Sequence, residues 1–326
     1  MPSPTIEWLL ASDEPWTRYR TRLDLLGEDP ASAGVKEDYR DMLSNPLILQ
    51  LIEHADTWPG PALKRHNDAA HPIYALSTLA DFGVRADQPD MQTVMKKVLA
   101  HQSIDGPFEH VGNIPVHFGG TGEDTWHWMA CDAPTLLYFL LCMEGPDHPQ
   151  AARAVEYLRG IVDENGWRCK NDPALGKFKG PGNRQHPCPI ANVYALKALS
   201  LVPGAEAFQS VQYGIEMLLT HWEQRTEKKY FLFGMGTDFK KLKYPFIWYD
   251  ILHVVDVLSR YETARRDPRL FDMTAAILEQ EKEGGCYQAT SMYRFWKEWS
   301  FADKKNPSAW LTFIVERIKK RLDIQQ

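Results

Sequence analysis

Side chains able to bind metals or transfer protons lie just before several regularly spaced prolines. His71, Asp132 and Cys188 each stand one or two residues before such a proline, and Cys131 is next to Asp132. These groups are the ligands of zinc sites that keep one position open for catalysis. A zinc site is therefore one hypothesis, although no compact spacing such as HExxH accompanies it. Alternatively, Asp132 caps a helix, the thiols pack as small apolar groups and His71 hydrogen-bonds a loop. No other cofactor is predicted.

A second acid lies among aromatic residues. Asp250 follows Trp248 and Tyr249, about one and a half turns into the helix expected after Pro245. A carboxyl in such surroundings has a raised pKa and can act as a general acid, with Tyr249 beside it. Asp132 would be the second carboxylate of an acid–base pair, and Trp248 would contact the substrate. Alternatively, Asp250 is a buried acid that hydrogen-bonds a neighbouring helix.

A histidine and several basic residues complete the candidate set. His127 follows Trp126 in a segment that also carries two acidic residues, which suits His127 to proton transfer. The basic, glycine-rich segment 176–184 contains Lys177 and Arg184 and could wrap a phosphate, although it is no Walker motif. The alternative for this segment, and for the basic segments 64–68 and 303–308, is a solvated loop. The predicted substrate contacts are Trp126, Trp248, His71, Arg65, Lys177 and Arg184.

Six prolines organise the elements that must position these residues. Their spacings are 57, 62, 55, 56 and 62 residues. After each proline, apolar side chains recur at helical spacing, which predicts inner helices. The prolines are Pro15, Pro72, Pro134, Pro189, Pro245 and Pro307. Amphipathic segments at 36–55, 91–102, 149–164, 206–222 and 268–281 predict an outer layer.

This alternation predicts an all-α protein, a single domain over residues 1–326 made of about six helical hairpins. A closed α/α toroid around a central cavity is favoured over an open solenoid. Inner-to-outer links are short, whereas the outer-to-inner links are long and would share one end of the toroid, where function is expected. The long links carry a surplus of basic residues in a chain of net charge −6. This favours a cationic mouth and an anionic ligand.

Composition narrows the function classes. The negative net charge does not favour nucleic-acid binding. Five cysteines without a CxxC pair fit free thiols in a reducing compartment. No apolar run is long enough to cross a membrane, and the first residues do not read as a signal peptide. A cytoplasmic location is therefore expected, and the oligomeric state is left open.

The ends of three outer segments carry a recognisable motif. Gln102 with Gly106 and Phe108, a Gly-Trp pair at 166–167 and Gly285 with Tyr287 resemble the repeat of squalene cyclases and protein prenyltransferases. The resemblance implies the α/α toroid, in an uncharacterised bacterial branch of that superfamily. The chain departs from this superfamily in its chemical motifs. It lacks the Asp-x-Asp-Asp cluster of squalene-type cyclases, and the lone Asp132 is the nearest candidate for that acid. It also lacks the Asp-rich Mg²⁺ motifs of class I terpene synthases.

Three functional hypotheses follow. The leading one is an enzyme that uses acid–base chemistry on an isoprenoid-like small molecule with a polar or anionic head, as a cyclase, isomerase or lyase. The second is a carbohydrate-active hydrolase or lyase, which also occurs on α/α barrels and needs two facing carboxylates. The third is a non-catalytic scaffold that binds a ligand or peptide.

Overall fold

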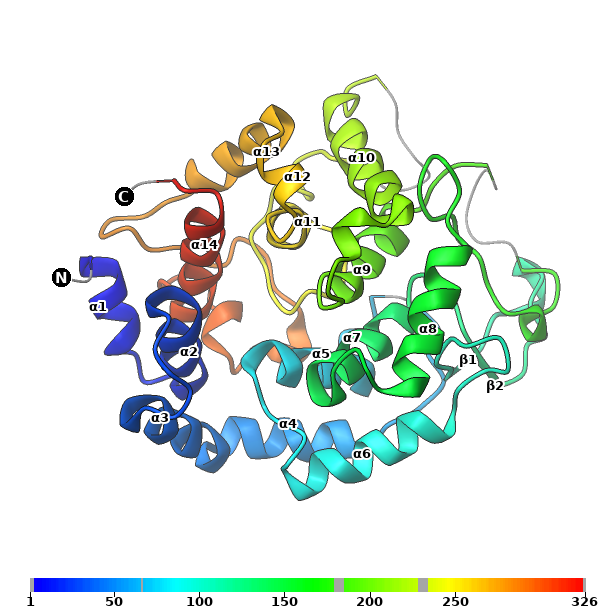
Figure 1. Cartoon of the computed structure of the whole chain (residues 1–326), viewed down its shortest axis with the longest axis horizontal. Helices are drawn as coiled ribbons and strands as arrows, with labels where there is room; N and C mark the ends of the chain where they lie inside the picture. The colour runs from blue at the N-terminus through cyan, green and yellow to red at the C-terminus, as the bar shows by residue number, and fades with distance from the viewer. Residues whose placement is uncertain (1–2, 66, 179–184, 228–233, 325–326) are drawn as a thin grey trace.

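Six helices form a closed inner ring. The computed structural model describes residues 3–65, 67–178, 185–227 and 234–324. Each ring helix contacts the next, and the last contacts the first (Figure 1). The ring consists of α2 (Pro15–Arg20), α5 (Pro72–Phe82), α7 (Ala133–Glu144), α9 (Pro189–Leu199), α11 (Ile251–Leu258) and α14 (Ala309–Arg321). The predicted all-α toroid is confirmed, because an open solenoid would leave its ends apart.

An outer layer surrounds the ring. It consists of α1 (Pro4–Leu10), α3 (Ala33–Ser44), α4 (Pro46–Asp56), α6 (Pro89–Ala100), α8 (Pro149–Gly160), α10 (Gln209–Glu223), α12 (Glu262–Arg265) and α13 (Pro268–Leu278). The first predicted outer segment is two helices, because the Asn45 side chain accepts a hydrogen bond from the Leu47 amide and caps α4 there. None of the helices in the described ranges has the length and hydropathy needed to cross a membrane.

The predicted helix starts are correct for four inner helices, which begin at or beside Pro15, Pro72, Pro134 and Pro189. The prediction is wrong for Pro245, since residues 245–250 are not helical. The Tyr194 hydroxyl lies 2.8 and 2.9 Å from the carbonyls of Phe246 and Ile247, which a helix would otherwise use. Asp250 therefore stands at the start of α11, not one and a half turns along it.

The motif at the outer-helix ends has a structural role. The amide of Trp167 donates to the side chain of Asn192 on α9 (3.0 Å), and the amide of Tyr287 donates to Thr312 on α14 (2.9 Å). Both aromatic side chains are fully buried. Glycine is required before Trp167, because a Cβ at Gly166 would lie 2.5 Å from the Asn192 Oδ1 atom. The motif thus fixes the links that lead to α9 and α14.

Aromatic rings fill part of the centre of the ring. Phe82 lies edge-on to Trp310 at 4.8 Å, and Tyr244 packs 5.6 Å from the same indole. The centre is therefore packed at this level and is not an open tube. The starts of the inner helices gather on one side of this layer with the long links, and their ends gather on the other side. A two-stranded hairpin, β1 (His110–Gly112) and β2 (Thr125–His127), lies within the longest link, where no strand was predicted.

Candidate active site

Asp132 forms a buried pair with a histidine that the sequence did not single out. The His110 Nε2 atom lies 3.3 Å from Asp132 Oδ2, and the two side chains are 0% and 4% exposed. The other ring nitrogen of His110 lies 3.1 Å from the Val111 carbonyl, which fixes the ring. Asp132 makes no capping hydrogen bond to α7, so the helix-cap alternative is wrong. A carboxylate that faces an imidazole can exchange a proton with it.

The hairpin holds this histidine in place. In the register of β1 and β2, His110 stands opposite His127, and their ring centroids lie 4.5 Å apart. The Nδ1 atom of His127 contacts the Thr125 carbonyl at 2.9 Å. A Cβ at Gly112 would lie 2.2 Å from the His127 ring, so this ring lies against bare backbone. His127, predicted to be catalytic, thus packs beside His110, which carries the contact to Asp132.

His71 caps α5. Its ring accepts the amide hydrogen of Ile73 (3.3 Å), while its Nε2 contacts the Pro61 carbonyl (3.1 Å). Burial, and then the charge of His110 6.3 Å away, lower the pKa of His71 to about 4. The loop-bonding alternative for this histidine is therefore what its contacts show.

Asp250 is a buried acid whose two carboxyl oxygens differ in their contacts. One oxygen accepts the amide hydrogen of His253 at 3.1 Å and caps α11. The other, Oδ2, is buried with no hydrogen-bond partner among the described residues. Burial raises the pKa of Asp250 to about 7, against the opposing effect of the nearby Lys243 ammonium. A carboxyl with this pKa exchanges protons near neutrality.

Three tyrosines connect the two acids. Burial, followed by the proximity of Tyr194 and Asp132, raises the pKa of Tyr74. Burial raises the pKa of Tyr194, as do Tyr293, Asp132 and Asp250 nearby. Burial and then the charge of Asp250 do the same for Tyr293. We call Tyr74, Asp132, Tyr194, Asp250 and Tyr293 the acid–tyrosine cluster.

The aromatic residues that flank Asp250 differ in position. The Tyr249 hydroxyl lies 3.2 Å from His221 on the outer helix α10, so this predicted catalytic residue faces away from the acid–tyrosine cluster. Trp248 is half-buried, and its carbonyl lies 3.2 Å from Nδ1 of His253. Trp126 stacks on His101 at 3.5 Å, next to Trp58, which is a packing contact with the end of α6.

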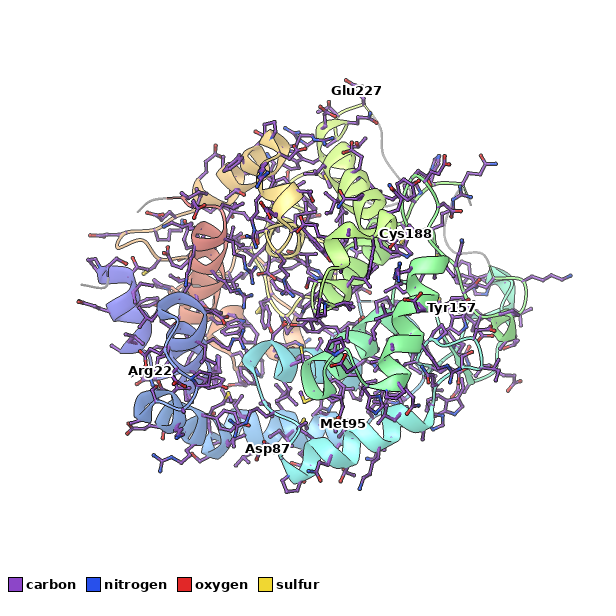
Figure 2. The ribbon with its side chains drawn as sticks, in the orientation of Figure 1. Arg22, Asp87, Met95, Tyr157, Cys188 and Glu227 are labelled. Atoms are coloured by element: carbon purple, nitrogen blue, oxygen red, sulfur yellow. The ribbon has the colours of Figure 1, made fainter. Side chains whose placement is uncertain are left out.

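Three thiols lie beside Asp132. A hydrogen bond with Cys169, and then burial, raise the pKa of Cys131. Burial raises the pKa of Cys188, which stands at the start of α9 (Figure 2). All five cysteines are free. Within the described ranges, no three His, Cys, Asp or Glu side chains form a group suited to a metal ion, so the zinc set with Asp132 and His71 does not come together.

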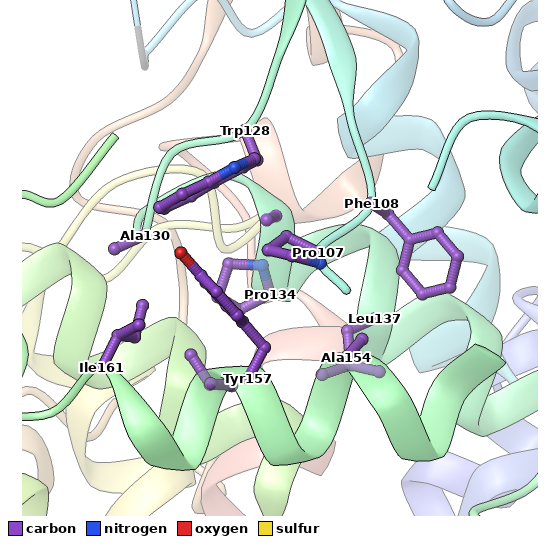
Figure 3. A pocket seen from close by; sticks show the side chains of 11 residues that line it. Pro107, Phe108, Trp128, Ala130, Pro134, Leu137, Ala154, Tyr157 and Ile161 are labelled. Carbon is purple, nitrogen blue, oxygen red and sulfur yellow. The ribbon is translucent and has the colours of Figure 1, made fainter. Parts of the chain in front are cut away.

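A pocket of about 490 Å³ opens to the surface beside one of these thiols, that of Cys169. Cys169 lies in its wall, with Trp128 and Tyr157 as aromatic sides and Arg168 and Lys170 as cations. Trp128 and Tyr157 meet edge to face at 5.1 Å and also border a narrow apolar pocket between α7 and α8 (Figure 3). The mouth thus combines apolar walls with positive charge, although both cations pair with Asp163.

The predicted basic contacts lie away from this pocket or outside the described residues. Arg65 and Lys177 are exposed on long links, and neither lines the pocket. Arg184 lies outside the described ranges. The residues that the sequence reasoning missed are His110 and the three tyrosines. The tyrosines stand in apolar stretches where core packing is the default, and His110 becomes visible only through its register with His127.

No protein-family model matches the chain, and no curated protein is similar to it in sequence. Among solved structures, a protein from Actinoplanes is 9% identical and covers 98% of both chains, with a TM-score of 0.45. The type II terpene cyclase MstE from Scytonema is 13% identical, covering 90% of this chain and 84% of its own, with a TM-score of 0.43. A variant of MstE in complex with geranylgeranyl dihydroxybenzoate is 13% identical, covering 99% and 96%, with a TM-score of 0.45.

Proposed function

We propose that this protein is an enzyme that moves protons on a small, partly apolar molecule, with Asp250 as the general acid. The observation that carries the proposal is the state of this carboxyl: it is fully buried, its pKa is about 7, and its Oδ2 atom has no hydrogen-bond partner within the described ranges. A protonated carboxyl of this kind has an O–H group whose proton it can donate to a substrate. A structural acid normally has its hydrogen bonds satisfied within the protein.

The partner of the acid is the pair of Asp132 and His110. Their contact of 3.3 Å offers a site that accepts a proton. For an isoprenoid-like substrate, the Asp250 O–H gives its proton to one carbon of a C=C bond, and the π electrons form the new C–H bond. The cation left on the other carbon is stabilised by aromatic faces, such as that of Tyr194. Asp132–His110 then takes a proton from a carbon next to the cation, and the electrons of that C–H bond form the new C=C bond, which completes an isomerisation or a cyclisation. The pair releases this proton to solvent, and solvent reprotonates Asp250.

The substrate class is inferred from the surface pocket beside Cys169, whose lining does not include Asp132 or Asp250. Trp128 and Tyr157 suit an apolar body, whereas Arg168 and Lys170 suit a polar or anionic head. A soluble, cytoplasmic enzyme of this kind needs no metal for the proton steps described. These assignments rest on the residues of this chain.

The test is an activity screen in D₂O. The protein is incubated with a panel of isoprenoid alcohols, acids and phosphate esters, and products are analysed by mass spectrometry for carbon-bound deuterium. We expect one product with deuterium on carbon, and at least a hundred-fold slower formation with Asp250→Asn. Asp13→Asn, an exposed acid, is the matched control and should leave the rate unchanged. Normal turnover by a folded Asp250→Asn variant would refute the assignment.

A carbohydrate-active enzyme remains the second candidate, because such an enzyme needs two carboxyl groups and both Asp132 and Asp250 act electrostatically on Tyr194. Release of reducing sugar from an oligosaccharide panel, abolished by either Asp→Asn change, would favour it over the isoprenoid substrate. Saturable ligand binding without any product would instead favour the non-catalytic scaffold.

A further inference from the structure

The opposite end of the ring carries a pocket that no part of the proposed chemistry uses. It has a volume of about 470 Å³ and lies where α5, α9, α11 and α14 end. This volume falls within the roughly 300–1,000 Å³ typical of small-molecule sites. Arginines dominate its lining: Arg20, Arg85, Arg260, Arg265, Arg317 and Arg321.

Positive charge exceeds negative charge here. With the buried Lys197, seven described cations gather at this end of the ring. Four carboxylates pair with them, namely Asp24, Asp81, Asp87 and Asp256. An internal surplus of about three positive charges therefore remains to be balanced by helix ends, solvent or a ligand.

The carboxylates within this pocket are already fully engaged. Asp256 alone contacts Arg260 (2.7 Å), Arg317 (2.9 Å) and Arg321 (3.0 Å). The carboxylate of Asp81 accepts hydrogen bonds from Lys197 (2.9 Å), Tyr138 (2.7 Å) and Tyr244 (3.0 Å). No carboxylate oxygen is thus left over for the remaining arginine donors.

Several arginine donors remain available. The Nε atoms of Arg260 and Arg317 are buried without a hydrogen-bond partner among the described residues. Burial lowers the pKa of Arg321 to about 9, and Arg317 and Arg260 add to this against the effect of Asp256. Arg85 is 55% exposed at the rim, where it holds Asp87 and covers the Tyr39 ring at 4.2 Å.

The helix ends account for part of this cluster. Arg265 donates to the carbonyls of Ser259 and Arg260, and Arg321 donates to that of Asp256, which satisfies the last turn of α11. These contacts engage one helix terminus and do not employ Arg85 or Arg20. Arg20 and Arg85 pair instead with Asp24 and Asp87. The surplus therefore lies with the arginines that share the single carboxylate of Asp256, and a bound anion would balance it.

We propose that this pocket binds the phosphate group of a phosphorylated small molecule. Guanidinium groups match phosphate oxygens in paired hydrogen bonds, and several of them converge here from different helices. The rings of Tyr19 and Tyr138, together with Val84, provide an apolar wall for the organic part of the ligand. The proposal is independent of the proton chemistry at the other end of the ring.

The test is calorimetric titration of the full chain with inorganic phosphate, pyrophosphate and citrate at low and high salt. We expect saturable one-to-one binding of pyrophosphate, stronger than that of citrate and weakened by salt. Arg85→Gln should weaken it about ten-fold, because one charge-assisted contact is lost. Arg321→Gln should do the same, and its folding is checked by circular dichroism because Arg321 also holds Asp256.

The matched control is Arg266→Gln, which removes the same charge from the same end of the molecule. Arg266 is exposed, pairs with Glu262 and does not line the pocket. Its binding of pyrophosphate should equal that of the unmodified protein. Three results would overturn the proposal: no saturable binding of any probe, equal weakening by Arg266→Gln, or tighter binding of citrate than of pyrophosphate.

Discussion

Asp250 directly precedes helix α11, and Asp256 lies within that helix six residues later. Both side chains are fully buried, yet their pKa values are shifted in opposite directions. Burial raises the pKa of Asp250 to about 7, because the Lys243 ammonium and the backbone amides of His253 and Leu252 oppose it only in part. Burial acts on Asp256 as well, but the charges of Arg317, Arg260 and Arg321 hold its pKa well below the usual value. Counterions, not burial, decide which of the two is charged.

The two ends of the ring differ in the same way. At the end with the long links, the acid–tyrosine cluster contains uncharged hydroxyls and few cations, so a proton can be exchanged there. At the other end, the charges of arginines and of Lys197 hold the pKa values of Asp24, Asp81 and Asp256 below their usual range. The division predicted from loop length, with chemistry at the long links and structure at the short ones, is thus too simple. The short-link end also carries a pocket whose charge is unbalanced.

The largest expected effect concerns the charged end. Asp256→Asn removes the common partner of three arginines and leaves buried positive charges uncompensated. We expect a loss of about 3–5 kcal/mol in the free energy of unfolding, measured by urea denaturation. The control is Asp41→Asn, which breaks an exposed pair with Arg18 and should cost less than about 1 kcal/mol. A loss for Asp256→Asn no larger than that of the control would contradict the assigned role.

Asp250→Asn should show the opposite behaviour. The folded pKa of about 7 lies above the unfolded value near 3.8, so the folded protein holds the extra proton between these limits. Its stability therefore falls as pH rises from about 4 to 7. Asparagine keeps the cap on α11 and removes the charge. At pH 8 the variant should be more stable than the unmodified protein by about 2–4 kcal/mol, with little difference at pH 4.

Thermal unfolding at several pH values between 4 and 8 measures this difference. Equal destabilisation of Asp250→Asn at every pH would mean that the carboxylate makes a structural contact that asparagine cannot replace. In that case the contrast drawn between the protonation states of Asp250 and Asp256 would not hold.

The smallest expected effect concerns His71, which separates a capping role from a charge effect. His71→Ala should lower stability at pH 8 by about 1 kcal/mol, whereas His71→Asn, which can still cap α5, should lower it less. The folded pKa of about 4 lies below 6.5, so the unmodified protein loses stability as pH falls through this range. Both variants should lack that acid-side loss. An asparagine variant as weak as the alanine variant would point to the Pro61 contact instead of the cap.

The sequence predicted the ring because proline and apolar periodicity are local signals. The same signals failed at Pro245, where the Tyr194 hydroxyl engages the backbone carbonyls of Phe246 and Ile247. A contact from another helix cannot be seen in a local pattern. The polar residues of the interior also differ in how well the sequence predicts them. Residue type alone made Asp132 and Asp250 candidates, whereas Tyr194 lies in an apolar stretch for which core packing is the default interpretation.

The arginine pocket was missed for a related reason. Its lining comes from six separate segments of the chain, and its arginines lie near the ends of different helices. Only the parallel arrangement of the inner helices brings them together. Basic residues concentrated in the long links drew attention to the other end, although Lys177 and Arg65 lie exposed on their links.

The central claim is that two buried carboxyls on one helix exist in opposite protonation states. It is tested most directly by carbon NMR of the protein labelled at its aspartate side-chain carboxyls, titrated from pH 3 to pH 9, with Asp250→Asn and Asp256→Asn for assignment. The account predicts that the Asp250 signal titrates near pH 7 and that the Asp256 signal stays in its ionised position throughout. Titration of Asp250 near pH 4, or of Asp256 within this range, would contradict it.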